Sequence, residues 1–324
     1  MLYRKLGNTG YDVSTVGFGT WQIGGGRWEV SSEEERIALL RKANDLGVNI
    51  FDVAVVYGQY KDENGYLQSK AQELLGQAFE KKRKHVIYCV KLGQFDEFSH
   101  QHDYQAQRIV HQFQQSLRRL KTDYIDIALI HAPSIAVVKN QSAISVLQTL
   151  KALGHIKSIG YSFEAEPEHV QHTLSQKIDV IMLQYNLLDQ ECAESIALAR
   201  EHGIGILVGG PFKRGYLTGQ YKNSNDFPKD DDYWQWNITN NPGKVEHILN
   251  RVNEMLNTYG TPENLRQESL RFILSQQGSN SCIIGHRNIE EVIENINAVN
   301  QFADSLTFKP VLIEDQAKED ATEL

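Results

Sequence analysis

The chain has 324 residues, of which 41% are hydrophobic and 23% charged, and this length and composition suit one globular α/β barrel or two smaller domains. Its formal net charge of −8 argues against nucleic acid or an anionic membrane as a partner of the general surface. No run approaches the roughly 18 apolar residues of a membrane span, no signal peptide is recognised, and the three widely spaced cysteines are typical of reduced core thiols. We therefore expect a globular cytoplasmic protein without a membrane anchor.

The first part of the chain predicts a hairpin, a strand and a capped helix. Residues 2–12 are polar with a turn at 7–10, which is typical of a small hairpin, and residues 13–18 predict the first buried strand. Ser32 and Glu35 form a capping box that starts a helix lasting to about residue 46. A second buried strand is expected at 48–53.

Strands and helices then alternate along the chain. Strands are predicted at 86–91, 124–130, 156–161, 180–183, 204–208 and 281–284, and helices near 104–120, 143–150, 168–176, 192–202 and 289–296. This alternation, without a linker, predicts one (β/α)8 barrel domain over residues 1–324 that carries the N-terminal hairpin as a cap. The polar segment 222–245 predicts a long functional loop after the seventh strand, and we expect a mobile tail from about residue 304.

Four polar side chains stand at the ends of neighbouring predicted strands, where barrels of this kind carry their chemistry. Asp52 and Tyr57 follow the second strand, while Lys91 closes the third and His131 the fourth. A buried carboxylate is costly without a cation, which Lys91 supplies. A nearby ammonium also lowers the pKa of a phenol such as Tyr57, and His131 can orient a carbonyl oxygen. The set predicts proton chemistry at a carbonyl that gains or loses hydride, and the hydride must come from a bound cofactor.

The sequence resembles the aldo-keto reductase family from Arg4 to about Asn300. The resemblance is carried by blocks along the whole chain: Gly17-Phe18-Gly19-Thr20-Trp21, Phe51-Asp52 with Tyr57-Gly58, Val90-Lys91, Asp123-Tyr124-Ile125-Asp126 with His131, Ile159-Gly160-Tyr161-Ser162, Tyr185-Asn186-Leu187-Leu188, Gly215-Tyr216-Leu217-Thr218-Gly219, and Gly285-His286-Arg287 with Glu294-Asn295. It implies a barrel capped by a hairpin, NADP(H) as cofactor and a small carbonyl or alcohol as substrate. It also implies that Asp52, Tyr57, Lys91 and His131 are a catalytic tetrad with Tyr57 as the general acid.

The resemblance further implies a row of cofactor-binding residues. These are Gly19, Thr20, Trp21, Asp52, Ser162, Gln184, Gly209, Pro211, Phe212, Gly215, Leu217, Gly285, Arg287, Glu291 and Asn295. Asn288 and Glu291 predict a helix start just after Gly285, where backbone N–H groups can bind an anion. Arg287 beside them can hold a phosphate bidentately. This matches the family's pocket for the adenosine 2′-phosphate and favours NADP(H) over NAD(H).

The nicotinamide end departs from the family pattern. Phe163 stands where the family usually has Asn, and Met182 where it usually has Gln. Gln184 lies two residues further along the strand and can substitute, whereas Gly209 replaces an aromatic residue that often stacks on the nicotinamide. We therefore expect a weakly held nicotinamide and slow turnover of generic aldehydes. The protein's own substrate, closed over by a long loop at 60–69, is expected to complete the site.

Other features have more than one interpretation. Trp21, Trp234 and Trp236 can line a substrate pocket or cover apolar surface. His100 and His102 have a metal-like spacing, but a solvated loop is the favoured interpretation because the strand ends offer no complementary ligand set. Three function classes stay open: an NADP(H)-dependent carbonyl reductase or alcohol dehydrogenase, a cofactor-binding sensor such as the family's potassium-channel β subunits, and a metal hydrolase. We favour the first.

Overall fold

The strands of the chain close into a parallel barrel in the computed structural model, which describes residues 1–25, 28, 30–96, 101–164, 167–229 and 232–302. The barrel strands are β3 (Val16–Gly19), β4 (Ile50–Ala54), β7 (Ile87–Leu92), β8 (Ile125–His131), β9 (Ile156–Ser162), β10 (Val180–Gln184), β11 (Gly205–Gly209) and β12 (Ser279–Gly285). Each strand pairs in parallel with the next one along the chain, and β12 pairs with β3 to close the ring. The predicted (β/α)8 barrel is confirmed.

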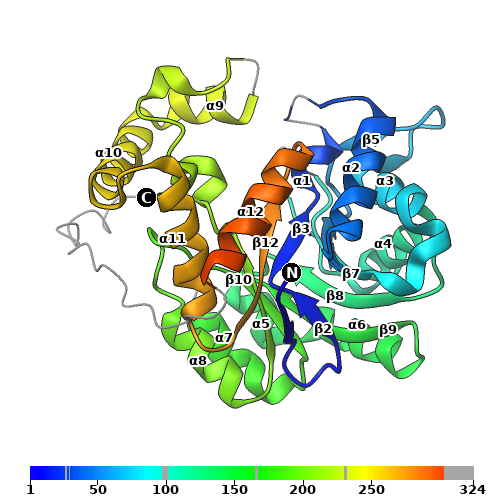
Figure 1. Ribbon diagram of the computed structural model, residues 1–324. Helices are drawn as coiled ribbons and strands as arrows, with labels where there is room; N and C mark the ends of the chain where they lie inside the picture. Colours follow the sequence, from blue (N-terminus) through cyan, green and yellow to red (C-terminus); the bar gives the residue numbers. More distant parts are fainter. Residues whose placement is uncertain (26–27, 29, 97–100, 165–166, 230–231, 303–324) are drawn as a thin grey trace.

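Helices connect the strands and surround the barrel (Figure 1). They are α1 (Trp21–Gly24), α2 (Glu33–Asp45), α3 (Lys70–Phe79), α4 (Ala106–Arg119), α5 (Ile135–Asn140), α6 (Ser142–Ala152), α7 (Pro167–Thr173), α8 (Ala193–Glu201), α9 (Asp232–Asn240), α10 (Pro242–Tyr259), α11 (Pro262–Ser275) and α12 (Ile289–Phe302). The capping box expected before α2 is present, since the Ser32 side chain accepts from the N–H of Glu35 and the Glu35 side chain accepts from the N–H of Ser32. Among the described helices, none has the length and apolarity needed to cross a membrane.

The barrel strands are apolar on both faces because one face packs inside the barrel and the other packs under the helices. Ile50, Cys89 and Leu129 belong to a core cluster inside the barrel. Phe51 and Val90, their neighbours in sequence, belong to the larger cluster between strands and helices. The three cysteines are buried free thiols.

An N-terminal hairpin of β1 (Tyr3–Lys5) and β2 (Asp12–Ser14) closes the lower end of the barrel in the view of Figure 1. Leu6 is fully buried and packs with the cluster inside the barrel. The single strand predicted at 13–18 is wrong, because the chain changes sheets at Thr15. There the N–H of Thr15 donates to the carbonyl of Leu2 rather than to a barrel strand.

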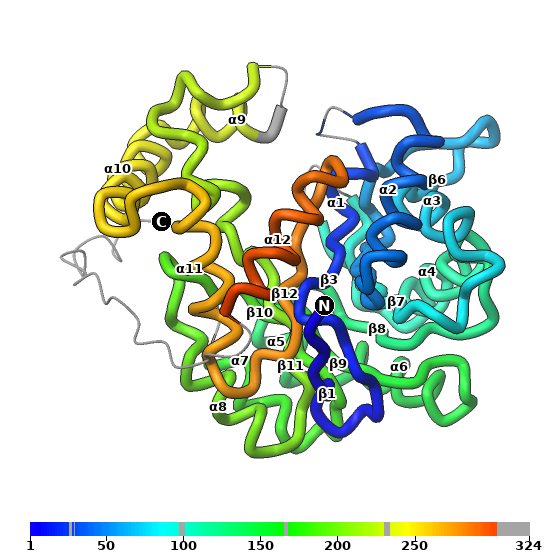
Figure 2. Tube along the Cα trace, viewed as in Figure 1, coloured from blue at the N-terminus to red at the C-terminus, as the bar shows by residue number. Residues whose placement is uncertain are grey.

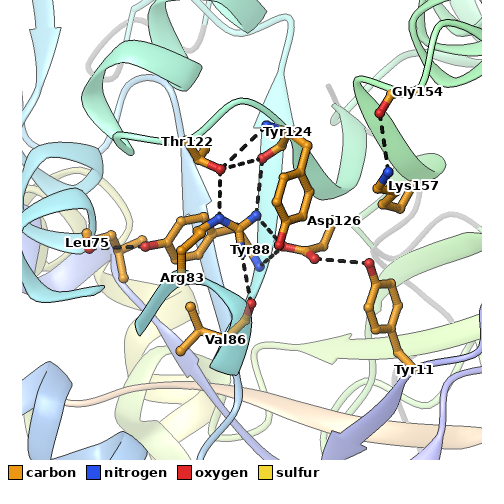
Figure 3. Close-up of polar contacts among 10 residues, drawn as sticks. All are labelled: Tyr11, Leu75, Arg83, Val86, Tyr88, Thr122, Tyr124, Asp126, Gly154 and Lys157. Atoms are coloured by element: carbon orange, nitrogen blue, oxygen red, sulfur yellow. Dashed lines mark hydrogen bonds and ion pairs between the residues drawn. The ribbon is translucent and has the colours of Figure 1, made fainter. Parts of the chain in front are cut away.

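A buried ion pair joins this hairpin to the N-terminal ends of two barrel strands (Figure 3). Asp126 accepts from Nη2 of Arg83 at 2.6 Å, from the N–H of Tyr88 at 2.9 Å and from the hydroxyl of Tyr11 at 3.0 Å. The guanidinium carbon of Arg83 lies 4.2 Å from the ring centroids of both Tyr88 and Tyr124. Removal of either partner would leave the other charge buried without its counterion, at the end of the barrel opposite to the strand mouths.

Two predicted loops contain secondary structure. The prediction of a long loop at 222–245 is wrong, because α9 lies within this segment and α10 begins at Pro242. This polar segment contains two buried aromatic residues, Phe227 and Trp234, whose rings stack with centroids 4.1 Å apart. Segment 60–69 forms most of an antiparallel hairpin of β5 (Gln59–Lys61) and β6 (Leu67–Ser69), visible beside α2 and α3 in Figures 1 and 2. The tail expected from about residue 304 lies outside the described residues.

Candidate active site

A cavity of about 600 Å³ opens at the C-terminal ends of the barrel strands. All four expected tetrad residues line it: Asp52, Tyr57, Lys91 and His131. In Figure 1, α9 lies on one side of this end of the barrel, and α1 and β5 lie on the other. The volume is that of a site for a small molecule or cofactor.

A buried ion pair forms the floor of the cavity. Asp52 comes from β4 and Lys91 from the neighbouring strand β7, and Nζ of Lys91 lies 2.8 Å from Oδ2 of Asp52. Burial raises the pKa of the Asp52 carboxyl, although the Lys91 ammonium acts in the opposite direction. Burial alone would lower the pKa of Lys91, but Asp52 and the hydroxyl of Tyr57 outweigh it, so that this pKa is raised. The proton therefore stays on Lys91 at neutral pH, and a cation is held inside the barrel.

Tyr57 is positioned by a tight turn after β4. Its N–H donates to the carbonyl of Ala54 at 3.2 Å, and its ring stacks on Trp21 with centroids 6.2 Å apart. The next residue, Gly58, has a φ of +63°, and a Cβ there would lie 2.0 Å from the carbonyl oxygen of Gly24. Only glycine fits this contact. The turn brings the Tyr57 ring centroid within 5.0 Å of Nζ of Lys91, which also hydrogen-bonds the Tyr57 hydroxyl.

His131 ends β8 at the edge of the same cavity. The hydroxyl of Tyr104 donates to the backbone carbonyl of His131 at 2.8 Å, and Ala132 turns the chain away with a φ of +43°. The His131 ring lies nearly perpendicular to the ring of Tyr57, at a centroid distance of 6.4 Å. The His131 ring is also nearly perpendicular to the ring of His102, at a centroid distance of 6.2 Å. A phenol from the turn after β4 and an imidazole from β8 therefore face one cavity, with β7 between the two strands.

The part of the cavity expected to hold the nicotinamide contains residues that match the aldo-keto reductase pattern and residues that depart from it. Ser162, Met182 and Gln184 line it, and Sδ of Met182 lies 4.0 Å from Nζ of Lys91. Phe163 also contributes to the lining, but its ring stacks on Tyr161 on the helix side of β9, at a centroid distance of 5.4 Å. Met182 and Gln184 are two residues apart on one strand, so their side chains leave it on the same side. Gln184 therefore carries an amide on the same side of β10 as Met182, at the wall of the cavity.

The opposite end of the cavity has a buried polar atom that requires a partner. Asn295 is 4% exposed, and its amide nitrogen donates to Nε2 of His286 at 3.2 Å. Among the described residues, its Oδ1 has no hydrogen-bond partner. Burial lowers the pKa of His286 to about 3, so the ring is neutral. A buried acceptor on the cavity wall fits a ligand with an amine donor, as an adenine base has.

Comparison with known proteins places these features in a family. The sequence model described as the aldo/keto reductase family matches residues 15–307. The chain belongs to this family.

Relatives of this aldo/keto reductase match it over most of their length. The aldo-keto reductase YhdN of Bacillus subtilis is 31% identical over 89% of this chain and 85% of its own. The NADH-specific methylglyoxal reductase of Escherichia coli is 28% identical over 91% of this chain and 92% of its own. A solved structure of the aldo-keto reductase AKR11C1 from Bacillus halodurans in its holo form superposes with a TM-score of 0.73, at 24% identity, and covers 97% of this chain and 99% of that one. The protein is thus an oxidoreductase of a family that acts on carbonyl or alcohol groups with a nicotinamide cofactor.

Most residues expected to bind cofactor line the cavity of this aldo/keto reductase. They are Gly19, Trp21, Asp52, Ser162, Gln184, Gly209, Pro211, Phe212, Gly215, Gly285, Arg287, Glu291 and Asn295. Thr20 and Leu217 do not line it. The hydroxyl of Thr20 donates to the backbone carbonyl of Asp52 at 2.8 Å and thereby ties β3 to β4, while Leu217 is fully buried.

Several cavity residues were not expected from the sequence. His102 was expected in a solvated loop, but it lines the cavity, and its ring stacks on that of Tyr104. His100 lies outside the described residues. Of the three tryptophans for which two interpretations were open, Trp21 and Trp234 line the cavity, whereas Trp236 is 55% exposed. Further lining residues are Gln22, Trp28, Gln94, Glu164, Arg214, Tyr221, Arg266 and Glu294. For the aromatic residues among them the sequence gives a weak indication of a cavity, since large rings in Gly-rich or polar segments require a surface to pack on.

The hairpin of β5 and β6 does not cover the cavity, contrary to expectation. None of the residues 60–69 is among its lining residues. The hairpin instead packs on α3 and α4, where the hydroxyl of Tyr60 donates to Glu73 and the guanidinium of Arg119 donates to the carbonyl of Leu67.

Within the part of the chain that the structure describes, no three His, Cys, Asp or Glu residues are grouped as a metal site.

If Gln184 bonds the nicotinamide carboxamide, the Gln184→Ala variant should bind its nicotinamide cofactor about 2–10-fold more weakly, because one neutral hydrogen bond contributes roughly 0.5–1.5 kcal/mol. Fluorescence titration of the full chain measures this change, and Met182→Gln is the comparison. If Met182→Gln tightens binding while Gln184→Ala has no effect, the nicotinamide amide lies at the level of residue 182 instead, and the role of Gln184 is wrong.

Proposed function

We propose that the protein transfers hydride between NADP(H) and an aldehyde or ketone, or the corresponding alcohol, with Tyr57 as the general acid and base. One observation carries the proposal. The buried pair of Lys91 and Asp52 holds a cation against the Tyr57 hydroxyl, at the edge of a cavity that His131 also lines. Side chains around this cavity can move a proton but cannot supply hydride.

In this proposal, each side chain of the tetrad has a separate part. Tyr57 donates the proton of its hydroxyl to the carbonyl oxygen of the substrate, and the reverse reaction returns it. Lys91 stabilises the phenolate that forms, since an ammonium next to a phenol favours the ionised state. Asp52 keeps Lys91 charged and in position. His131 hydrogen-bonds the carbonyl oxygen and orients it toward Tyr57.

The chain also has groups that suit the two ends of a nicotinamide cofactor. When bound, the cofactor supplies the hydride. Ser162 and Gln184 would hold the carboxamide, and Asn295 would accept from the adenine amine. Arg287, beside the start of α12, would bind the adenosine 2′-phosphate, and this supports NADP(H).

Steady consumption of NADPH with a panel of small aldehydes and ketones tests the proposal. We expect turnover that requires both the carbonyl compound and NADPH. We expect the reverse reaction with the matching alcohol and NADP+, because a proton-transfer site serves both directions. Tight cofactor binding without turnover of any compound in either direction would contradict the proposal and favour a cofactor-binding sensor.

A further inference from the structure

The carboxylate of Glu291 occupies the position in which the start of α12 would hold an anion. Its Oε2 accepts from the backbone N–H of Arg287 at 2.8 Å, and its Oε1 lies 3.3 Å from Nη2 of the same arginine. Asn288 fixes this arrangement, because its side-chain oxygen accepts from the N–H of Glu291 at 2.9 Å. The groups of Arg287 expected to bind phosphate therefore already contact an anion of the chain itself.

Neighbouring charges at this end of the cavity are paired in the same way. Arg266 forms an ion pair with Glu294, and both line the cavity together with Arg287 and Glu291. Burial acts to lower the pKa of Arg287, but Glu291 and the hydroxyl of Tyr221 outweigh it and raise this pKa. Arg266 and Arg287 thus each face a carboxylate of α12, and each pair is neutral overall.

A 2′-phosphate and a 2′-hydroxyl would meet these groups differently. A phosphate bound to Arg287 must displace the carboxylate of Glu291 or lie beside it. In the second case the phosphate and the carboxylate, both negative and both in contact with one guanidinium, repel each other in a partly buried site. A hydroxyl can instead donate a hydrogen bond to the carboxylate, as the ribose 2′-hydroxyl of NAD does to acidic residues in other dinucleotide sites. Arg287 therefore favours the phosphate, and Glu291 favours the hydroxyl.

We propose that Glu291 is a specificity-determining residue that offsets Arg287, so that this protein binds NADH and NADPH with similar affinity. This proposal rests on the proposed function, because it places the adenosine end of the cofactor against α12. It also extends the cofactor choice of that function to NAD(H), since a single carboxylate cancels most of the preference for the 2′-phosphate. Neutralising the carboxylate converts the protein to a preference for NADPH.

Two adenosine fragments test the role of Glu291 without involving the nicotinamide end. 2′,5′-ADP and 5′-AMP differ only in the 2′-phosphate, and calorimetric titration of the full chain with each gives the ratio of their dissociation constants. We expect the wild-type affinities to agree within about tenfold, and Glu291→Gln to shift the ratio by about tenfold toward 2′,5′-ADP. Arg287→Ala should shift it toward 5′-AMP.

Glu290→Gln is the matched control. Glu290 carries the same charge on the same first turn of α12, but it is exposed and does not line the cavity. It should shift the ratio by less than about twofold, because solvent screens exposed charges. A wild-type preference for 2′,5′-ADP above about tenfold, or a shift in Glu291→Gln no larger than in Glu290→Gln, overturns the role of Glu291 and leaves the proposed function standing. Failure of both fragments and both whole cofactors to bind overturns the proposed function, and the role of Glu291 with it.

Discussion

Replacement of Tyr57 by Phe is expected to lower kcat by at least about 10²-fold while leaving NADPH binding nearly unchanged. The substitution removes only the hydroxyl, which is the group that would donate the proton. The ring keeps its stacking on Trp21 and its position near Lys91, so that the cavity retains its shape. Loss of rate without loss of binding is the signature of a group that acts on the reacting atoms.

Steady-state kinetics with the best carbonyl substrate, together with fluorescence titration by NADPH, measure both quantities for Tyr57→Phe. Tyr60→Phe is the matched control. It removes a hydroxyl that bonds Glu73 on the β5–β6 hairpin, outside the cavity, and should keep wild-type kcat. If Tyr57→Phe retains most of the activity, another group supplies the proton and the proposed acid is wrong.

The Asp126→Ala variant is expected to lose about 3–5 kcal/mol of unfolding free energy, because it leaves a buried cation without its partner. The side chains of Asp126 and Arg83 are only 5% and 10% exposed. The substitution also removes the acceptor for the N–H of Tyr88 and for the hydroxyl of Tyr11 (Figure 3). Arg83 would remain between two tyrosine rings with little access to water.

Urea unfolding of Asp126→Ala and of wild type measures the loss. Asp45→Ala is the control, because it breaks an ion pair with Lys82 whose side chains are 55% and 54% exposed, and it should cost less than about 1 kcal/mol. Under native conditions the folded variant should bind NADPH as wild type does, since Asp126 lies at the end of the barrel opposite to the cavity. Similar losses in the two variants would show that the Arg83 network contributes no more than a surface pair.

The barrel, and the meeting of Asp52, Tyr57, Lys91 and His131 at one cavity, could be predicted because their signals are local and repeated. Apolar runs of strand length recur along the chain, and a polar residue at the end of such a run is costly unless it has a partner. Parallel strands place their C-terminal ends at one rim, so that adjacent strands bring Asp52 and Lys91 into contact without further information.

Other features could not be predicted because they depend on contacts between distant loops or on side-chain conformation. Alternation within residues 13–18 does not show that the chain changes sheets at Thr15. His102 lines the cavity beside an isolated β-bridge between its backbone and that of Gln94, and a contact of this kind leaves no periodic pattern in the sequence. Glu291 and Arg287 are recognisable as cofactor-site residues in the sequence. Their pairing with each other appears only when the first turn of α12 is built.

The seam between β3 and β12 joins the beginning of the chain to its end. Residues 282–285 of β12 pair with residues 16–19 of β3, and beside this pairing Arg4 of β1 donates to the carbonyl of Ser279, while Asn280 donates to the carbonyl of Lys5. During synthesis β3 emerges early and β12 late, so the ring cannot close until nearly the whole chain is available, and such long-range pairing is intrinsically slow. Arg287 and Asn295 follow β12 directly, and their end of the cavity is completed only by this closure. A ligand that binds there stabilises the closed seam by mass action, which couples the last step of folding to occupancy of the site.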